Sequence, residues 1–214
     1  QKQINNAITQ AESNSSGEIL PVVITASGRY DRAEDLFGLV FAMILISIFW
    51  FFFQNVTPTT ENWIADYQVS FNLFYIILIT IIGFVAGAAL ATYFPALRLP
   101  FIAPKEMEEE VNRSALEYFS KFNVSNTKNQ TGILLFVSLF ERRVFVYGDV
   151  AINKKISQER WQEICDMIID GMKKNKAAEG VKKAILECGK ILAKEFPIKK
   201  NDKNELANKI ILID

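Results

Sequence analysis

The sequence contains no histidine in its 214 residues. This absence excludes histidine general bases and the Ser-His-Asp and Cys-His relays, each of which needs an imidazole, and the usual zinc sites that contain histidine. Cysteine is nearly absent as well. Cys165 and Cys188 lie on predicted helices without a CxxC spacing, which favours two buried, reduced thiols. The alternative for these two residues is a disulfide.

Neither sign of charge is in excess, because 24 Lys and Arg residues balance 24 Asp and Glu residues. There is no basic stripe with interleaved aromatic residues, so nothing indicates nucleic acid as a partner. Half of the residues are hydrophobic, at the high end for a soluble domain. The excess is concentrated in two long uncharged runs.

These runs are residues 36–53 and 71–94, with 18 and 24 residues and no charge. Each meets the requirement of about 20 residues for crossing a bilayer, the first only just. The sequence therefore predicts two transmembrane helices; the alternative is a pair of buried core helices. In the second run Gly83, Gly87 and Ala91 form a small-xxx-small stripe, which predicts close packing on the first helix or, alternatively, on a second copy or a partner.

The loop 54–70 between the two runs contains acidic residues but no Lys or Arg. The other flanks carry Arg29 and Arg32 before the first run and Arg98 after the second. By the positive-inside rule, both ends of the chain face the cytoplasm and the loop lies outside. Reduced cysteines agree with that side of the membrane.

The remaining sequence predicts a soluble α/β domain. An extended run at 18–27 precedes the membrane segment, and an amphipathic helix at 105–122 follows it. Residues 131–149, "TGILLFVSLFERRVFVYGD", read as two strands around a charged corner at 141–143. Two further amphipathic helices follow, and a short one precedes the first strand.

A strand, a crossover with a helix and a second strand form a βαβ unit, in which the two strands are parallel. The expected fold is therefore a small α/β sandwich, with parallel first two strands, an antiparallel third strand and helices on both faces. A two-helix transmembrane hairpin interrupts it. The expected boundaries are 1–35 and 95–197 for the α/β domain, 36–94 for the membrane hairpin and 198–214 for a C-terminal tail.

Several stretches carry a family resemblance. "AITQAESNSSGEILPVVI" is similar to the opening of a TPM domain, in which an Ala-Glu helix leads through a Ser-Gly-Glu turn into the first strand. "TGILLFVSLFERRVFVYGDVAI", "AAEGVKKAILECGKILAKEFP" and "NELANKIILID" resemble the second half of that family. The family includes thylakoid-lumen proteins, photosystem II repair proteins and a receptor modulator. The inserted pair of apolar runs resembles a bacterial membrane subgroup.

The resemblance implies a multi-pass protein of the bacterial inner membrane, and the charged flanks predict that its soluble domain is in the cytoplasm. It implies assembly, repair or modulation of a membrane complex, with an integral membrane protein, such as a LemA-type protein, as partner. Phosphatase activity and divalent-metal binding are ascribed to some members of the family. A metal-dependent, acid phosphatase-like hydrolase is therefore the alternative function.

The residues themselves offer one candidate metal site. If the first two strands are parallel, Glu18 and Asp149 lie at the same edge of the sheet, where two carboxylates can hold Ca²⁺ or Mg²⁺. The alternative is that Glu18 caps or pairs locally and Asp149 makes a turn. No Asp-x-Asp pair, Gly-x-Ser-x-Gly elbow or phosphate-clamping cysteine loop accompanies them, so no catalytic residue is predicted.

The same strand directions place the charged corner at the opposite edge, where the chain leaves for the membrane. A cationic collar against the lipid headgroups is expected there, each arginine contributing about 1 kcal/mol near anionic lipid. The alternative is that the corner residues are simply solvated. The collar consists of Arg29, Arg32, Arg98, Arg142 and Arg143.

The predicted orientation can be tested by labelling. A cysteine introduced into the loop 54–70 should react with a membrane-impermeant thiol reagent on intact cells, because the loop faces outward. A cysteine introduced into the soluble domain should react only after lysis. The reverse pattern would invert the assignment.

Overall fold

A computed structural model of the chain describes residues 1–53, 55–59, 66–70, 72–198 and 204–214. These residues form two compact units. One is an α/β domain made of residues 1–28 and 105–214, and the other is a helical unit made of residues 29–104. The apolar segment therefore interrupts the domain in sequence.

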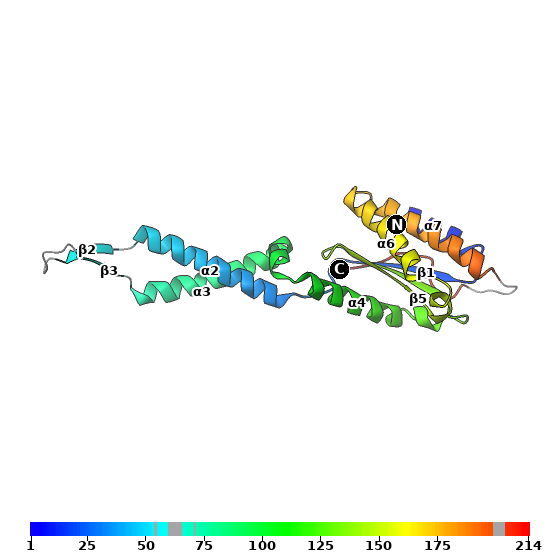
Figure 1. Ribbon diagram of the computed structural model, residues 1–214, viewed down its shortest axis with the longest axis horizontal. Helices are drawn as coiled ribbons and strands as arrows, with labels where there is room; N and C mark the ends of the chain where they lie inside the picture. The colour runs from blue at the N-terminus through cyan, green and yellow to red at the C-terminus, as the bar shows by residue number, and fades with distance from the viewer. Residues whose placement is uncertain (54, 60–65, 71, 199–203) are drawn as a thin grey trace. The chain divides into compact units, whose positions relative to one another are not determined.

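The α/β domain contains a four-stranded sheet and helices on both of its faces (Figure 1). Its strands are β1 (Glu18–Ile24), β4 (Gly132–Ser138), β5 (Arg143–Gly148) and β6 (Ile211–Ile213). Its helices are α1 (Lys2–Glu12), α4 (Pro104–Lys121), η2 (Val124–Asn126), α5 (Val150–Asn153), α6 (Gln158–Lys173) and α7 (Ala177–Glu195).

The strands lie in the order β5-β4-β1-β6. β1 and β4 are parallel, with Glu18 opposite Gly132 and Ile24 opposite Ser138. β5 runs antiparallel to β4, with Arg143 opposite Ser138 and Gly148 opposite Ile133. The predicted parallel pair and antiparallel hairpin strand are confirmed. All seven residues of β4 are buried, as expected for a central strand covered on both faces.

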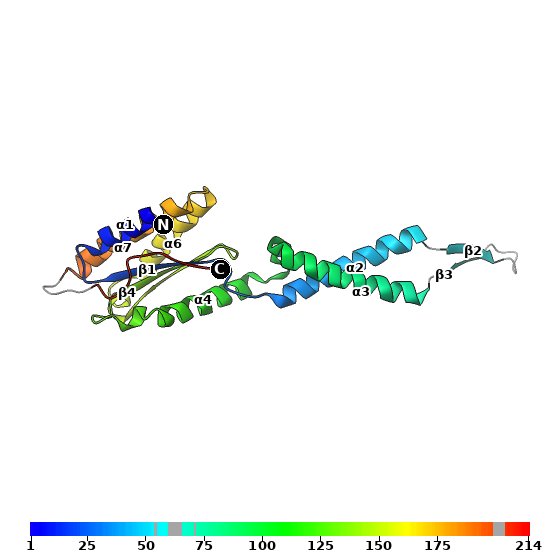
Figure 2. The ribbon, with the colours of Figure 1, turned by 180° about the vertical axis from the view of Figure 1, so that it is seen from behind.

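Side chains that alternate along the strands build a separate core on each face. Ile19, Ile133 and Leu135 pack with the apolar stripes of α1, α6 and α7. On the other face, Leu20 and Phe136 belong to the core beneath α4. Figure 2 shows α1, α6 and α7 on one side of the sheet and α4 on the other, which confirms the prediction of helices on both faces.

The end of the chain contributes a fourth strand. Sequence analysis expects only a tail at 198–214, but Ile211–Ile213 pair in parallel with Val22–Ile24 of β1. The strand is three residues long, and Leu212 is exposed, so its hydrophobic pattern is too short to stand out. Its partner β1 stabilises it, because a strand needs hydrogen-bonding neighbours. β1 is thus an inner strand.

The helical unit consists mainly of α2 (Asp31–Phe53) and α3 (Leu73–Tyr93). Both helices are long and apolar enough to span a membrane, and most of their apolar side chains are exposed. A short antiparallel pair, β2 (Asn55–Thr59) and β3 (Asp66–Ser70), lies between them in the chain, and η1 (Pro95–Phe101) follows α3. The rest of the loop 54–70 lies outside the described residues.

Small residues let α2 and α3 approach closely. Gly83, Gly87 and Ala91 are the buried residues of α3. A Cβ atom on Gly87 would lie 2.9 Å from the Cα of Gly38, and one on Gly83 would lie 2.9 Å from the Cα of Ala42. Such distances leave no room for a side chain, so these glycines face the partner helix within the hairpin.

Candidate functional site

The two carboxylates of the candidate metal site flank the start of β4. Glu18 is opposite Gly132 across the parallel ladder, and the backbone N–H of Asp149 donates to the carbonyl of Gly132 at 2.8 Å. The same end of the sheet therefore carries both residues, as the strand directions require. Gly132 lies against η2, where a Cβ atom would come within 2.2 Å of the Val124 carbonyl oxygen.

Each of these carboxylates is buried and accepts a backbone hydrogen bond. Oε1 of Glu18 accepts from the N–H of Glu205 at 3.1 Å. Oδ1 of Asp149 accepts from the N–H of Val150 at 2.6 Å and so caps α5. Glu205 in turn accepts from the N–H of Lys128 at 2.7 Å. Sequence analysis placed Glu205 in the C-terminal tail and missed these contacts, which depend on residues far away in the chain.

A third carboxylate, which sequence analysis also missed, lies beside Glu18. Oε1 of Glu12, at the end of α1, accepts from the N–H of Ile19 at 2.8 Å. Its Oε2 is buried and has no hydrogen-bond partner in the described part of the chain. Burial raises the pKa of Glu12 to about 8; the Ile19 N–H opposes this rise, and the nearby charge of Glu18 adds to it.

The described residues contain no group of three or more His, Cys, Asp or Glu side chains arranged to hold a metal ion. Ca²⁺ usually takes six to eight oxygen ligands. Glu18 and Asp149 would supply only part of this set. One oxygen of Asp149 fits a cation, because Oδ2 is buried without a hydrogen-bond partner among the described residues. The metal site stays a prediction.

The opposite end of the sheet is organised by Glu141. This side chain is 6% exposed, and its Oε1 accepts from the N–H groups of Ser27 at 2.9 Å and Gly28 at 3.2 Å. Oε2 accepts from the hydroxyl of Ser138. Glu141 therefore binds the segment in which the chain leaves β1 to the turn between β4 and β5. For Glu141, the alternative of a solvated corner is wrong.

The arginines of the expected collar are divided between the two units. In the α/β domain, Arg142 is exposed at the turn, with its backbone in the left-handed region, and Arg143 forms an ion pair with Glu108 at 3.4 Å. In the helical unit, Arg98 forms an ion pair with Glu34 at 2.7 Å and donates to the carbonyl of Arg29 at 3.0 Å. Arg32 is exposed near the start of α2. The collar itself stays a prediction.

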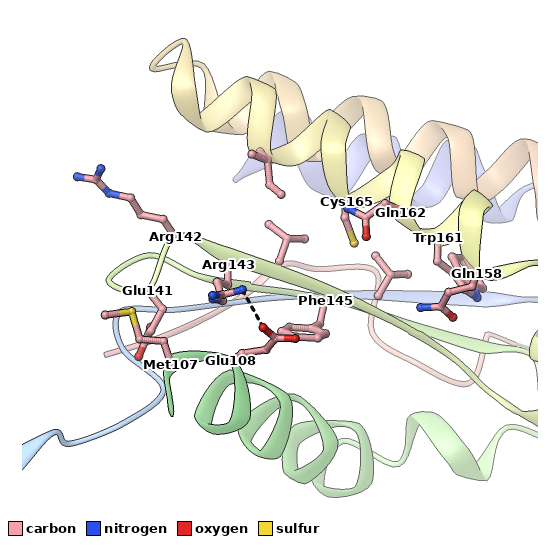
Figure 3. Close-up of a pocket in the computed structure, with 13 residues that line it drawn as sticks. Met107, Glu108, Glu141, Arg142, Arg143, Phe145, Gln158, Trp161, Gln162 and Cys165 are labelled. Atoms are coloured by element: carbon pink, nitrogen blue, oxygen red, sulfur yellow. Dashed lines mark hydrogen bonds and ion pairs between the residues drawn. The ribbon is translucent and has the colours of Figure 1, made fainter. Parts of the chain in front are cut away.

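A cavity of about 440 Å³ lies beside β5 and is here called the β5 groove. Figure 3 shows it between α4, which supplies Met107 and Glu108, and α6, which supplies Gln158, Trp161, Gln162 and Cys165. Its other lining residues belong to α6 or to the segment of the turn and β5, namely Glu141, Arg142, Arg143, Val144, Phe145, Val146 and Ile169. Its volume is typical of ligand sites, about 300–1,000 Å³.

Both cysteines are free and buried, as expected for reduced thiols. Burial raises the pKa of Cys165 to about 11 and raises that of Cys188 further. The nucleophilic form of a cysteine is the thiolate, so a raised pKa suppresses reactivity at neutral pH. Cys165 reaches the β5 groove as a neutral thiol, and the nearby backbone N–H of Val146 slightly opposes the rise of its pKa.

Comparisons with known proteins agree with this fold. A family model described as the TPM domain matches residues 101–191. Residues 101–191 are a TPM domain. The match takes in α4, β4, β5, α5, α6 and most of α7, while α1 and β1 precede it.

A solved structure has the same fold. It is the NMR structure of BA42 protein from the psychrophilic bacterium Bizionia argentinensis, with 23% identity and a TM-score of 0.55. The alignment covers 99% of this chain and 90% of that chain. No curated protein matches the chain. Around the TPM domain, the structure adds β1 between β4 and β6, so the sheet extends beyond the matched segment.

The raised pKa of Glu12 predicts a pH dependence of stability. Between pH 4.5, the pKa of an ordinary glutamate, and pH 8, the folded state holds a proton that the unfolded state has lost. The free energy of unfolding should therefore fall as pH rises through this window. Glu12→Gln keeps an acceptor for Ile19 and removes the titration, so it should be more stable than the wild type above pH 8, by on the order of 2 kcal/mol.

Chemical unfolding of the full chain in detergent at pH 5 and pH 9, followed by tryptophan fluorescence, measures this difference. Glu117→Gln on the exposed surface of α4 is the matched control and should behave as the wild type at both pH values. An equal pH dependence in Glu12→Gln and the wild type would contradict the assignment.

Proposed function

We propose that this protein is a membrane-anchored TPM-domain module that acts without catalysis, as an interaction, assembly or modulation factor for a membrane protein complex. The observation that carries the proposal is the place of the apolar hairpin in the chain. It is inserted between β1 and β4, which are direct neighbours in the sheet. Folding of the sheet thus joins the two sides of the insertion.

The exit of the chain from β1 supports the same proposal. Ser27 and Gly28, the last residues of the α/β domain before the insertion, are bound by the buried carboxylate of Glu141, so hydrogen bonds as well as the backbone hold this point of the domain.

The proposed location is the bacterial inner membrane, with the α/β domain in the cytoplasm. The absence of Lys and Arg from 54–70 and the arginines on the other flanks support this orientation. The proposed partner is an integral membrane protein, for which a LemA-type protein is one candidate, or a larger membrane complex. The exposed apolar faces of α2 and α3 give such a partner, or lipid, a surface to contact.

Co-purification tests the interaction function. The tagged full chain, expressed at its native level and extracted in mild detergent, should elute with a membrane protein in fixed stoichiometry through size-exclusion chromatography. An untagged strain treated in the same way controls for adventitious capture. Elution only as a lone monomer, in several mild detergents, would overturn the proposal.

The second candidate function is a divalent-metal-dependent phosphatase. The buried Oδ2 of Asp149, which lacks a hydrogen-bond partner among the described residues, favours a cation at the edge that Glu18 shares. The metal would be Ca²⁺ or Mg²⁺, since carboxylate oxygens suit hard cations. Some proteins with this domain have phosphatase activity ascribed to them. A bound cation would act as a Lewis acid on the phosphate group of the substrate.

A phosphatase assay separates the two functions. If the second function holds, the full chain in detergent should hydrolyse p-nitrophenyl phosphate, and EDTA should abolish the activity. Asp149→Asn retains the acceptor oxygen that caps α5 but removes the charge, so it should lose the activity, whereas Asp170→Asn, exposed on α6, should retain it. Activity that is absent, or equal in all three proteins, would refute the phosphatase.

A further inference from the structure

One edge of the sheet is open beside the β5 groove. β5 is the outermost strand on its side, and it pairs only with β4 in the described part of the chain. An unpaired strand edge presents a row of N–H and C=O groups that another extended segment can bind. The β5 groove runs along this edge, because Val144, Phe145 and Val146 line it.

The register shows which backbone groups point outward. The N–H of Asp149 donates to the carbonyl of Gly132, directly opposite, so this pair occupies a hydrogen-bonded position of the ladder. Pairs alternate along an antiparallel ladder, so Tyr147, Phe145 and Arg143 also bond to β4, whereas Gly148, Val146 and Val144 point away from it. Asn153 Nδ2 donates to the Gly148 carbonyl at 2.5 Å and closes that end of the edge.

The outward groups that remain belong to Val144 and Val146. By this register, the carbonyls and the N–H groups of both residues point away from β4, on the side where Val144 and Val146 line the groove. These groups are spaced for an added strand, which bonds to every second residue of the edge strand. One added strand of four to five residues would use all of them.

The surroundings of the edge select a single strand. Glu108 and Met107 of α4 line one wall of the groove, and Gln158 and Gln162 of α6 line the other. Figure 3 shows the two helices on either side of β5. A second copy of the domain would bring its own α4 and α6 to this edge, whereas an extended segment brings no flanking helices. The groove therefore fits a segment without flanking helices.

Positive charge at one end of the groove favours an occupant with acidic residues. A second cavity of about 520 Å³ shares Arg142 and Ile169 with the β5 groove and is also lined by Lys173. Neither Arg142 nor Lys173 forms an ion pair in the described part of the chain, and both are exposed. Glu108 is paired with Arg143, and Glu141 is buried on backbone N–H groups. The end beside the turn is therefore positive.

We propose that the β5 groove binds an extended, acidic segment of a partner polypeptide as an added strand. Backbone hydrogen bonds to Val144 and Val146 supply the affinity common to all sequences. Carboxylates at one end of the segment bind Arg142 and Lys173 and fix its direction and register. This assignment rests on the proposed interaction function and names the surface and the chemistry of the partner.

A fluorescent peptide with alternating Val and Thr residues and two Glu residues at one end is the probe. Binding to the full chain in detergent, measured by fluorescence anisotropy, should be saturable. N-methylation of alternate amides gives two isomers, each of which has lost the N–H donors on one edge of the peptide. The isomer without the donors that face β5 should bind about tenfold more weakly, and the other should bind as the parent does. Replacing the two Glu residues with Lys should also weaken binding by about tenfold.

Variants of the chain test the same contacts from the other side. Arg142→Glu should remove the preference for the acidic peptide over the lysine peptide, whereas Lys154→Glu, exposed at the end of α5 and outside the groove, should retain it. Val146→Pro removes an N–H that points away from β4, a substitution that edge strands tolerate. It should weaken all peptides equally, and its circular dichroism should match that of the wild type.

Three results would overturn the assignment. They are no saturable binding up to about 1 mM peptide, equal binding of the two N-methylated isomers, or dimerisation of the chain that Val146→Pro abolishes. Failure of the groove is distinguishable from failure of the interaction function. If Arg142→Glu and Val146→Pro still co-purify with the membrane partner in fixed stoichiometry, the partner binds elsewhere and only the groove assignment is lost.

Discussion

Seven consecutive residues of β1 lie beside seven of β4, and the chain between these strands contains both apolar helices. The entropy cost of closing so long a connection grows only with the logarithm of its length, so the pairing tolerates the insertion. Both hydrophobic cores depend on this pair. Ile19 and Ile133 belong to the core of α1, α6 and α7, and Leu20 and Leu134 belong to the core beneath α4. Without the pair, neither layer of helices has a sheet to cover.

Buried carboxylates secure both ends of this pair. At the strand starts, Glu12 accepts from the backbone of β1, and Glu18 accepts from the backbone of the C-terminal segment. At the strand ends, Glu141 accepts from the segment that follows β1. Burying a polar or charged group costs free energy unless hydrogen bonds compensate, so these contacts are specific rather than strongly stabilising. They join segments that hydrophobic contact alone would leave loosely placed.

The strand directions and the two layers of helices follow from the sequence, because connectivity and hydrophobic period determine them. A strand, a crossover and a strand must be parallel, and the stripes at Val111 and Ile164 assign α4 and α6 to cores. β6 does not follow, since three residues carry too little pattern and only the presence of β1 makes them a strand. Site residues show the same division: the shared edge of Glu18 and Asp149 is predictable, whereas their individual hydrogen bonds are not.

The partners of Glu141 were missed for a related reason. Its contacts with Ser27 and Gly28 join positions more than a hundred residues apart, and no local spacing signals them. The β5 groove depends on knowing that β5 has β4 on one side and no strand on the other, which is a property of the whole sheet. Helical and strand patterns can be predicted from neighbouring residues, whereas contacts between distant segments are known only from the assembled sheet.

The split of the domain by its apolar hairpin also imposes an order of events during synthesis. β1 leaves the ribosome first, and its partner β4 follows more than a hundred residues later, at translation rates of about 5–20 residues per second. For those seconds β1 has no neighbour in the sheet, while α2 and α3 are already in the nascent chain. β1 and β4 can pair only after the hairpin has been synthesised. The domain therefore folds only in chains in which the whole insertion has already been translated.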